Sequence, residues 1–332
     1  MKQTLEHTSL TSSEAQSKSQ NMGISEVLPD VASESTAQTL ASLPWVGMNK
    51  IEVPILWPEA NGSQLRIPSL VSAQVSLDKK SSRGIHMSRL YLSVQKILAS
   101  QPISSKSLRL LTDEFLNSHK ELSQSARVVI DFNLPIERKA LKSDFMGWRS
   151  YPVRMIAVQS KNDFNFMIEV LVTYSSTCPA SAALSRQIQS QDFATAFPNS
   201  GSAEQISAWL LSAQGMPATP HAQRSEARII AQIKSDSQFQ AIDLINLIEN
   251  ALQTPVQAAV KREDEQEFAR RNGLNLMFCE DAARKIQQAF DTQSDLVDYY
   301  GQFQHFESLH PHNAVSFIQK KAQSGLNSFI NT

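Results

Sequence analysis

The stretch VVIDFNLPI at residues 128–136 decides the fold, because apolar side chains return at every second position. Such alternation predicts a strand of an antiparallel sheet that buries one face. The residues on the apolar face are Val128, Ile130, Phe132, Leu134 and Ile136. The stretch FNFMIEVLVTY at residues 164–174 repeats the pattern over a longer span. Further strands are predicted at 51–57, 71–77, 151–158, 225–235 and 296–307.

Helical spacing separates these strands. Met87, Leu90, Tyr91, Val94 and Leu98 fall on one helical stripe. Further helices are predicted at 107–119, 203–211, 239–252, 262–271 and 278–290. The predicted elements follow the order strand, strand, helix, helix, strand, strand, and the second half of the chain repeats part of this order. Such an order predicts an α+β protein rather than a parallel βαβ sheet.

The chain is predicted to consist of a leader and two similar halves. Residues 1–27 are polar and predict a disordered leader, because they contain too few apolar residues to pack. The first module is assigned to 28–158 and the second to 159–332. The second contains a proline-rich connection, 178–224, that is expected to be irregular apart from one short helix.

Composition restricts the function. With 41% hydrophobic and 19% charged residues and a formal net charge of −1, the chain is globular and lacks the basic field that nucleic acid or an anionic membrane would need. Two cysteines cannot make a disulfide framework, and no signal peptide or membrane span is apparent. These features predict a cytoplasmic protein.

Three residues could serve chemistry, although each also suits an ordinary role. Cys178 follows a strong strand and is either a small buried residue or a thiolate ligand. His221 lies in a loop, where histidines commonly make surface hydrogen bonds. Glu263 lies in a charged helix whose composition fits a solvated face.

Two clusters are more distinctive. Three of the seven histidines fall within residues 305–312, which indicates either metal binding or acid–base chemistry. Basic residues gather at residues 79–89, where a strand gives way to a helix start, an arrangement suited to phosphate as well as to a solvated turn. The residues alone indicate no more than a metal site with a mixture of sulfur, nitrogen and oxygen ligands.

Taken together, these segments resemble the prokaryotic type IB GTP cyclohydrolase I family. The resemblance covers residues 28–314, with its blocks in the family's order. The matching blocks are LPD at 28–30, RGIHMSR at 83–89, Cys178-Pro179, HAQRS at 221–225, KREDE at 261–265 and FESLHPH at 306–312.

The resemblance implies a tunnelling fold, built from two tandem modules of antiparallel sheet with helices packed on one face. It also implies conversion of GTP and water to 7,8-dihydroneopterin triphosphate and formate, the entry step to folate. The implied cofactor is a divalent metal ion, Zn, Mn or Fe. Members assemble as homotetramers with sites between subunits, and neither nucleic acid nor a membrane is implied as a partner.

The resemblance also assigns residues. The implied metal ligands are Cys178, His221, Glu263 and His310. Catalysis is expected from Cys178 with Glu307 and His312, of which His312 is the candidate proton shuttle beside His310. Glu280 is expected to recognise guanine, and the triphosphate is expected at Arg83, His86, Ser88 and Arg89.

Two departures from the family keep alternatives open. Ala180 occupies the position of a second cysteine that many members carry, which admits a non-catalytic pterin- or purine-binding protein. The connection through residues 187–215 is longer than usual, and it is either a surface elaboration or a cap on the site. The sister archaeal activity, which gives a cyclic phosphate product, is a further alternative.

Overall fold

The computed structural model describes residues 36–59, 61–161 and 163–320, so the predicted leader and the 28–30 block lie outside the described residues. Eight strands form one sheet in chain order, and every neighbouring pair is antiparallel. The strands are β1 (Leu43–Pro58), β2 (Gln64–Leu77), β3 (Ser125–Lys139), β4 (Met146–Ser160), β5 (Asp163–Thr177), β6 (Ala222–Ile233), β7 (Leu296–His305) and β8 (Ala314–Gln319).

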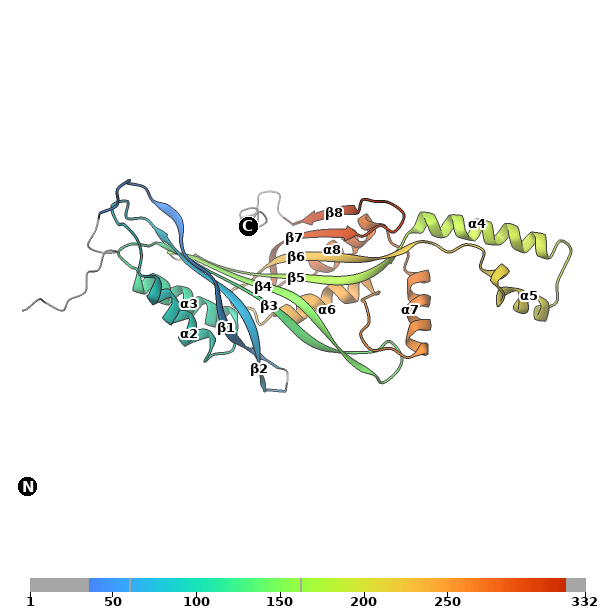
Figure 1. Cartoon of the computed structure of the whole chain (residues 1–332), viewed down its shortest axis with the longest axis horizontal. Helices are drawn as coiled ribbons and strands as arrows, with labels where there is room; N and C mark the ends of the chain where they lie inside the picture. The colour runs from blue at the N-terminus through green and yellow to red at the C-terminus, as the bar shows by residue number, and fades with distance from the viewer. Residues whose placement is uncertain (1–35, 60, 162, 321–332) are drawn as a thin grey trace, which may run out of the picture.

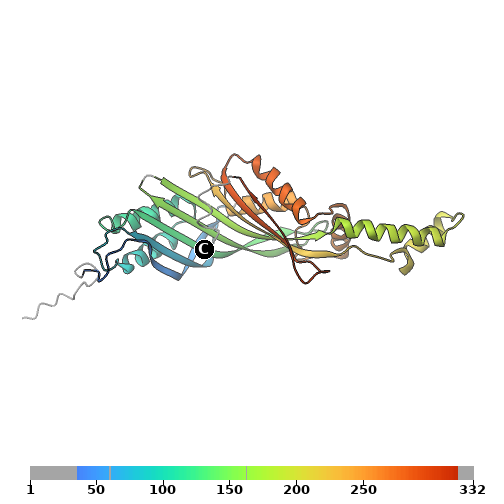
Figure 2. The same cartoon turned by 90° about the horizontal axis from the view of Figure 1, so that it is seen from above.

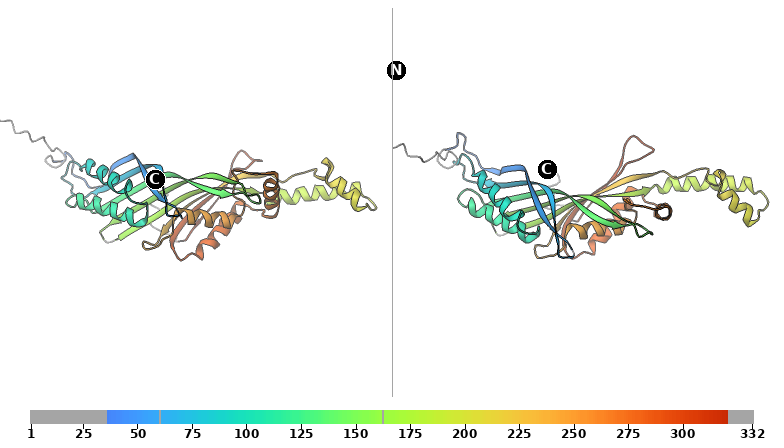
Figure 3. Two further views of the ribbon diagram at one scale, coloured as in Figure 1. Left: turned by 90° about the horizontal axis from the view of Figure 1, so that it is seen from below. Right: turned by 60° about the horizontal axis from the view of Figure 1, so that its bottom comes forward.

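Helices cover one face of this sheet, which confirms the predicted α+β class (Figures 1 and 3). Under β1–β4 lie α2 (Met87–Leu98) and α3 (Ser105–Ser118). Under β5–β8 lie α6 (Ala241–Leu252) and α8 (Cys279–Asp291), with α7 (Arg262–Leu274) near the end of β5. None of the helices in the described ranges is long and apolar enough to cross a lipid bilayer.

The alternation seen in the sequence produces the core. Val128 and Ile130 of β3, and Ile168 and Val172 of β5, are fully buried between the sheet and the helices. One hydrophobic cluster runs from β1 to β8 and includes the inward faces of the four helices beneath the sheet. Because the sheet is continuous, the division at residue 158 falls inside β4, two residues before that strand ends. The two-module division stays a prediction.

The connection between β5 and β6 differs from the prediction. Instead of an irregular segment, residues 179–220 form an arm that projects beyond the sheet (Figures 1 and 2). The arm contains α4 (Pro179–Ala196), α5 (Ala203–Leu210) and the short 3-10 helix η1 (Ala213–Gly215). Helix α4 buries only Ala182 and Ser185, so it lacks the apolar stripe that would have revealed it in the sequence.

Aromatic contacts hold the arm together at its outer end. The ring centroid of Phe193 lies 5.2 Å from that of Phe197 and 5.6 Å from that of Trp209, which joins α4 to α5. Strand β8 was not predicted from the sequence. That strand has six residues, and Ile318 alone among them is buried, so its alternation is too short to recognise.

An acidic residue of α7 provides a test of stability against pH. Glu267 accepts hydrogen bonds from Arg270 Nε at 2.7 Å and Arg271 Nε at 2.8 Å. These bonds lower the pKa of Glu267 to about 2, below the value of about 4.3 expected in an unfolded chain. The depressed pKa contributes stability that is present above about pH 4.3 and is lost as the pH falls toward 2.

We therefore expect Glu267→Gln to lower the melting temperature at pH 7, and the difference from the unaltered protein to shrink as the pH falls from about 4.3 toward 2. Thermal melts followed by circular dichroism across this range measure both effects. Glu265→Gln, an exposed carboxylate on the same helix, is the matched control and should show little change. A gap that stays constant with pH would contradict the assignment.

Candidate active site

Cys178 and His221 meet where two neighbouring strands end. Strand β5 ends at Thr177, which pairs with Ala222 at the start of β6, so the next residue outward on each strand is Cys178 and His221. The Cys178 N–H donates to the His221 carbonyl at 3.2 Å. Sheet register therefore brings together two residues that are 43 positions apart in the sequence.

The start of the arm fixes Cys178 further. Pro179 occupies the first turn of α4, where a missing N–H costs nothing, and Cys178 is the N-cap. The Ser181 N–H donates to Cys178 Sγ at 3.5 Å, and the Ser181 hydroxyl oxygen accepts from the His221 N–H at 3.1 Å. The thiol is thus held at the helix N-terminus, where negative charge is favoured.

The imidazole of His221 has two neighbours on one side. Its Nδ1 lies 3.0 Å from Gln223 Oε1 and 3.6 Å from Glu307 Oε2. The side chains of His221 and Glu307 are 20% and 14% exposed, so the pair is largely shielded from water. Cys178, His221 and Glu307 therefore form the nucleus of the candidate site.

Next to His221 lies a buried polar cluster that was not predicted from the sequence. Gln223 Nε2 donates to Ser176 Oγ at 3.0 Å, and Ser176 Oγ lies 3.1 Å from His305 Nδ1. His305 Nε2 lies 3.0 Å from the Tyr174 hydroxyl. Continuing the alternation of β5 one step beyond Tyr174 would have placed Ser176 on the buried face.

Burial sets the charge state within this cluster. Desolvation lowers the pKa of His305 to about 4, so its imidazole is neutral at physiological pH. Desolvation likewise raises the pKa of Tyr174. His305 is thus a core residue, unlike His310 and His312, with which it is grouped in the sequence.

His310 and His312 lie in the loop between β7 and β8. The loop begins beside β6, because the Phe306 N–H donates to the Arg224 carbonyl at 3.1 Å. The two imidazole rings are exposed and stacked, with centroids 5.0 Å apart and planes at 11°. The loop thus starts at the end of the sheet from which α4 projects (Figure 1).

Glu280 belongs to the same end of the sheet. The Met277 N–H donates to the Thr177 carbonyl at 3.1 Å, which places the start of α8 beside the end of β5. Glu280 is exposed in the first turn of α8. It is therefore available to a ligand without rearrangement of the core.

Glu263 lies elsewhere. It is exposed in the first turn of α7, an end held to the β3–β4 connection because Asp264 accepts from the N–H groups of Lys142 and Ser143 at 2.7 and 2.8 Å. Asn272, nine residues further along α7, is the residue that contacts Ser175 near Cys178. At about 1.5 Å per residue, Glu263 lies about 13 Å from that contact along the helix.

The predicted metal ligands are accordingly not all gathered by one copy of the chain. Within residues 36–59, 61–161 and 163–320, no three His, Cys, Asp or Glu side chains are arranged to hold a metal ion. Cys178 and His221 are brought together, and the loop that carries His310 starts nearby, whereas Glu263 is separated from them.

The basic cluster lies in the other half of the molecule. Arg83, His86, Ser88 and Arg89 fall between β2 and the first turn of α2, under the β1–β2 end of the sheet. The arm, whose first helix begins directly after Cys178, lies at the opposite end (Figure 2). Arg83 and Ser88 are exposed, and Arg89 Nη1 donates to the Ser118 carbonyl at 2.8 Å.

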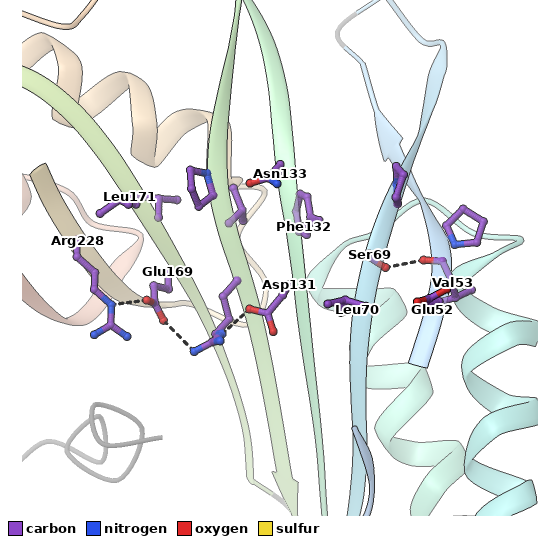
Figure 4. A pocket seen from close by; sticks show the side chains of 16 residues that line it. Glu52, Val53, Ser69, Leu70, Asp131, Phe132, Asn133, Glu169, Leu171 and Arg228 are labelled. Carbon is purple, nitrogen blue, oxygen red and sulfur yellow. Dashed lines mark hydrogen bonds and ion pairs between the residues drawn. The ribbon is translucent and has the colours of Figure 1, made fainter. Parts of the chain in front are cut away.

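The open face of the sheet carries a hollow of about 870 Å³ (Figure 4). Across it, Arg154 contacts Asp131 at 2.6 Å and Glu169 at 3.8 Å, and Arg228 contacts Glu169 at 2.5 Å. Both arginines of the hollow are thus paired with carboxylates, and none of the predicted site residues is among those that line it. The candidate residues Cys178, His221 and Glu307 thus lie where β5 and β6 meet at their ends and not in this hollow.

Comparison with solved structures defines the fold. The uricase of Arthrobacter globiformis superposes with a TM-score of 0.50 over 88% of this chain and 100% of the other, at 7% identity. At this identity the likeness shows the fold alone, which is the tunnelling fold: an antiparallel sheet with helices on one face.

Sequence comparison then identifies the family. Residues 28–316 match the family described as type I GTP cyclohydrolase folE2. GTP cyclohydrolase FolE2 of Bdellovibrio bacteriovorus is 52% identical over 295 residues, which cover 88% of this chain and 96% of the relative. GTP cyclohydrolase FolE2 of Pseudoalteromonas translucida is 44% identical over 300 residues, which cover 90% of this chain and 99% of the relative. The chain belongs to the type I GTP cyclohydrolase FolE2 family and is an enzyme of that class.

Proposed function

We propose that this chain converts GTP and water to 7,8-dihydroneopterin triphosphate and formate at a site centred on Cys178 and His221. The observation that carries the proposal is the junction of these residues at the ends of β5 and β6, with Glu307 beside the imidazole. The similarity to FolE2 relatives over nearly the whole chain supports the reaction assigned.

The donor atoms at the junction fit a divalent metal ion. The Cys178 sulfur and a His221 imidazole nitrogen, which lie at the ends of neighbouring strands, suit Zn²⁺. A carboxylate ligand such as Glu263 also admits Mn²⁺ or Fe²⁺. Cys178 and His221 would hold the ion with His310 and Glu263. The metal would supply Lewis acidity, which lowers the pKa of bound water from about 15.7 to about 7.

We infer that each site is completed by a second copy of the chain. Glu263 is exposed and about 13 Å along α7 from the contact near Cys178, and the basic cluster lies in the opposite half of the molecule. Both features are explained if neighbouring subunits supply these residues, as in a homotetramer with sites between subunits.

The chain's own residues then have separate tasks. Glu280 would accept hydrogen bonds from the N1–H and 2-amino groups of guanine, which adenine does not offer as a pair. Addition of water at C8, opening of the imidazole ring and loss of formate all require proton transfers. His312, stacked on His310 in the exposed loop, would carry protons, and Glu307 would orient the neighbouring His221.

The test is incubation of the purified protein with GTP and each of Zn²⁺, Mn²⁺ and Fe²⁺. We expect a pterin that fluoresces after oxidation, together with formate in equal amount. A product whose phosphates form a cyclic ester would assign the sister archaeal activity. Binding of GTP without turnover under all three metals would leave a binding protein, consistent with Ala180 at the second cysteine position.

A further prediction concerns the triphosphate. If Arg83 and Arg89 bind phosphate oxygens, replacing either by alanine should raise KM for GTP by about tenfold, because charge-assisted hydrogen bonds contribute about 1.5–3 kcal/mol. Steady-state kinetics measure the change, with kcat expected to alter less. Lys106→Ala, which removes an exposed cation from α3 in the same half of the molecule, is the control and should leave KM unchanged. An unaltered KM in both arginine variants would remove the cluster from the site.

A further inference from the structure

A series of buried, hydrogen-bonded polar side chains leads from His221 into the core. Its members come from three adjacent strands and lie on the helix-covered face, where Ser176 pairs with Gln223 and Ser225 pairs with both Tyr174 and His305. Tyr174, Ser176 and Ser225 are 0% exposed, His305 is 1% exposed and Gln223 is 8% exposed. Polar groups in a core cost free energy unless each has a hydrogen-bond partner, so their directions can be worked out.

The donor and acceptor roles in this series of hydrogen bonds follow from the hydroxyl of Tyr174. The Tyr174 hydroxyl is fully buried, and within the described part of the chain its hydrogen-bond partner is His305 Nε2 at 3.0 Å. The phenol therefore donates to Nε2, which leaves the proton of the neutral imidazole on Nδ1. His305 Nδ1 then donates to Ser176 Oγ, and Ser176 donates its single proton to Ser225 Oγ at 2.8 Å.

This arrangement suits the amide of Gln223. Ser176 Oγ can accept a second hydrogen bond, which it receives from Gln223 Nε2 at 3.0 Å. The amide oxygen consequently faces His221 Nδ1 at 3.0 Å and can only accept. The Glu307 carboxylate, 3.6 Å from the same nitrogen, also favours a proton there. The reversed amide would instead turn the lone pair of Nδ1 toward the carboxylate.

We propose that Gln223 is a positioning residue that fixes His221 as the Nδ1–H tautomer, with its amide held in place by the buried Ser176–His305–Tyr174 chain. In this tautomer Nε2 carries the lone pair and is the nitrogen presented for coordination. The inference rests on the proposed role of His221 as a metal ligand, and it adds the residues that orient the ring. Partners of this kind, which bind the second nitrogen of a ligating histidine, typically affect metal affinity by 10–100-fold.

The test compares Gln223→Met with Gln223→Glu. Methionine matches the length of glutamine but offers Nδ1–H only a weakly accepting thioether sulfur, whereas glutamate keeps the oxygen acceptor. With Zn²⁺ alone as the probe, in competition with a chromophoric chelator, we expect Gln223→Met to weaken affinity about 10–100-fold. Gln223→Glu should bind Zn²⁺ about as tightly as the unaltered protein.

A matched control separates orientation from general stability. Gln159 of β4 is also 8% exposed and hydrogen-bonded, through Thr112, but it lies in the other half of the molecule. Gln159→Met should lower the melting temperature without altering Zn²⁺ affinity. Tyr174→Phe, which removes one hydroxyl at the far end of the buried chain, should weaken Zn²⁺ binding in the same direction as Gln223→Met and by less.

The Zn²⁺ affinities of these variants decide whether Gln223 orients His221. Unchanged Zn²⁺ affinity in folded Gln223→Met would overturn the inference, as would equal losses in Gln223→Met and Gln223→Glu. If Gln223→Met fails to fold, Tyr174→Phe replaces it, and unaltered Zn²⁺ affinity there would have the same force. His221→Ala identifies a different failure: if it binds Zn²⁺ normally, the proposed metal site is wrong, whatever Gln223 does.

Discussion

Cys178→Ala should lose its metal and its activity together. In the proposed site the Cys178 thiol would supply the sulfur donor at the junction of β5 and β6, so we expect metal content to fall from near one equivalent per site to a small fraction. We expect kcat/KM for GTP to fall on the order of a thousandfold, because without the ion the pKa of water returns toward about 15.7. Metal analysis of the purified protein and the pterin fluorescence assay measure the two quantities.

The other cysteine of this chain, Cys279, offers a matched control. Cys279 is buried at the start of α8, where its Sγ lies 3.2 Å from Ser316 Oγ, and no role in the site is assigned to it. Cys279→Ala should retain metal while losing some stability. Normal metal content in both Cys178→Ala and His310→Ala would dispose of the four-ligand proposal. Metal lost equally on replacing either cysteine would point to general destabilisation.

Glu280→Gln should reduce kcat/KM for GTP about tenfold or more. The carboxylate would accept from both guanine donors, and the amide presents an N–H₂ group to one of them. Leaving polar groups mispaired in an enclosed site costs about 1–3 kcal/mol, and each 1.4 kcal/mol corresponds to about a factor of ten. Inosine triphosphate, which lacks the 2-amino group, should be penalised less by the substitution than GTP.

The neighbouring carboxylate separates recognition from helix stability. Asp281 accepts from the Phe278 N–H at 3.0 Å and so caps α8. Asp281→Asn should lower the melting temperature by weakening the cap while leaving the preference between GTP and inosine triphosphate unaltered. If Glu280→Gln treats both nucleotides as the unaltered enzyme does, Glu280 is only a favourable charge at a helix start.

The sheet could be predicted because its strands alternate cleanly. Val128 and Ile130 of β3, and Ile168 and Val172 of β5, are the fully buried residues that the pattern required. Helix α4 escaped prediction for the opposite reason: it buries only Ala182 and Ser185, so its sequence has no apolar stripe. A helix without a buried face leaves little periodic trace in a sequence.

The candidate site was predictable in part. The matching blocks pointed to Cys178 and His221, and sheet register brings the two together. Which hydrogen bonds orient His221 could not be foreseen, because Ser176, Gln223 and His305 interact across three strands whose exact register the pattern leaves open. The separation of Glu263 from Cys178 likewise depends on the direction of α7, which spacing alone does not determine.

The arm also explains how the family could accommodate connections of different length at this point. Its two ends, Cys178 and His221, are hydrogen-bonded neighbours, so an insertion between them leaves the distance that the chain must close unchanged. Loop-closure entropy grows only with the logarithm of length: replacing a turn of about five residues by one of about forty involves about three doublings and costs about 2 kcal/mol. A segment of this size can therefore be gained or lost during evolution while the thiol and the imidazole keep their places.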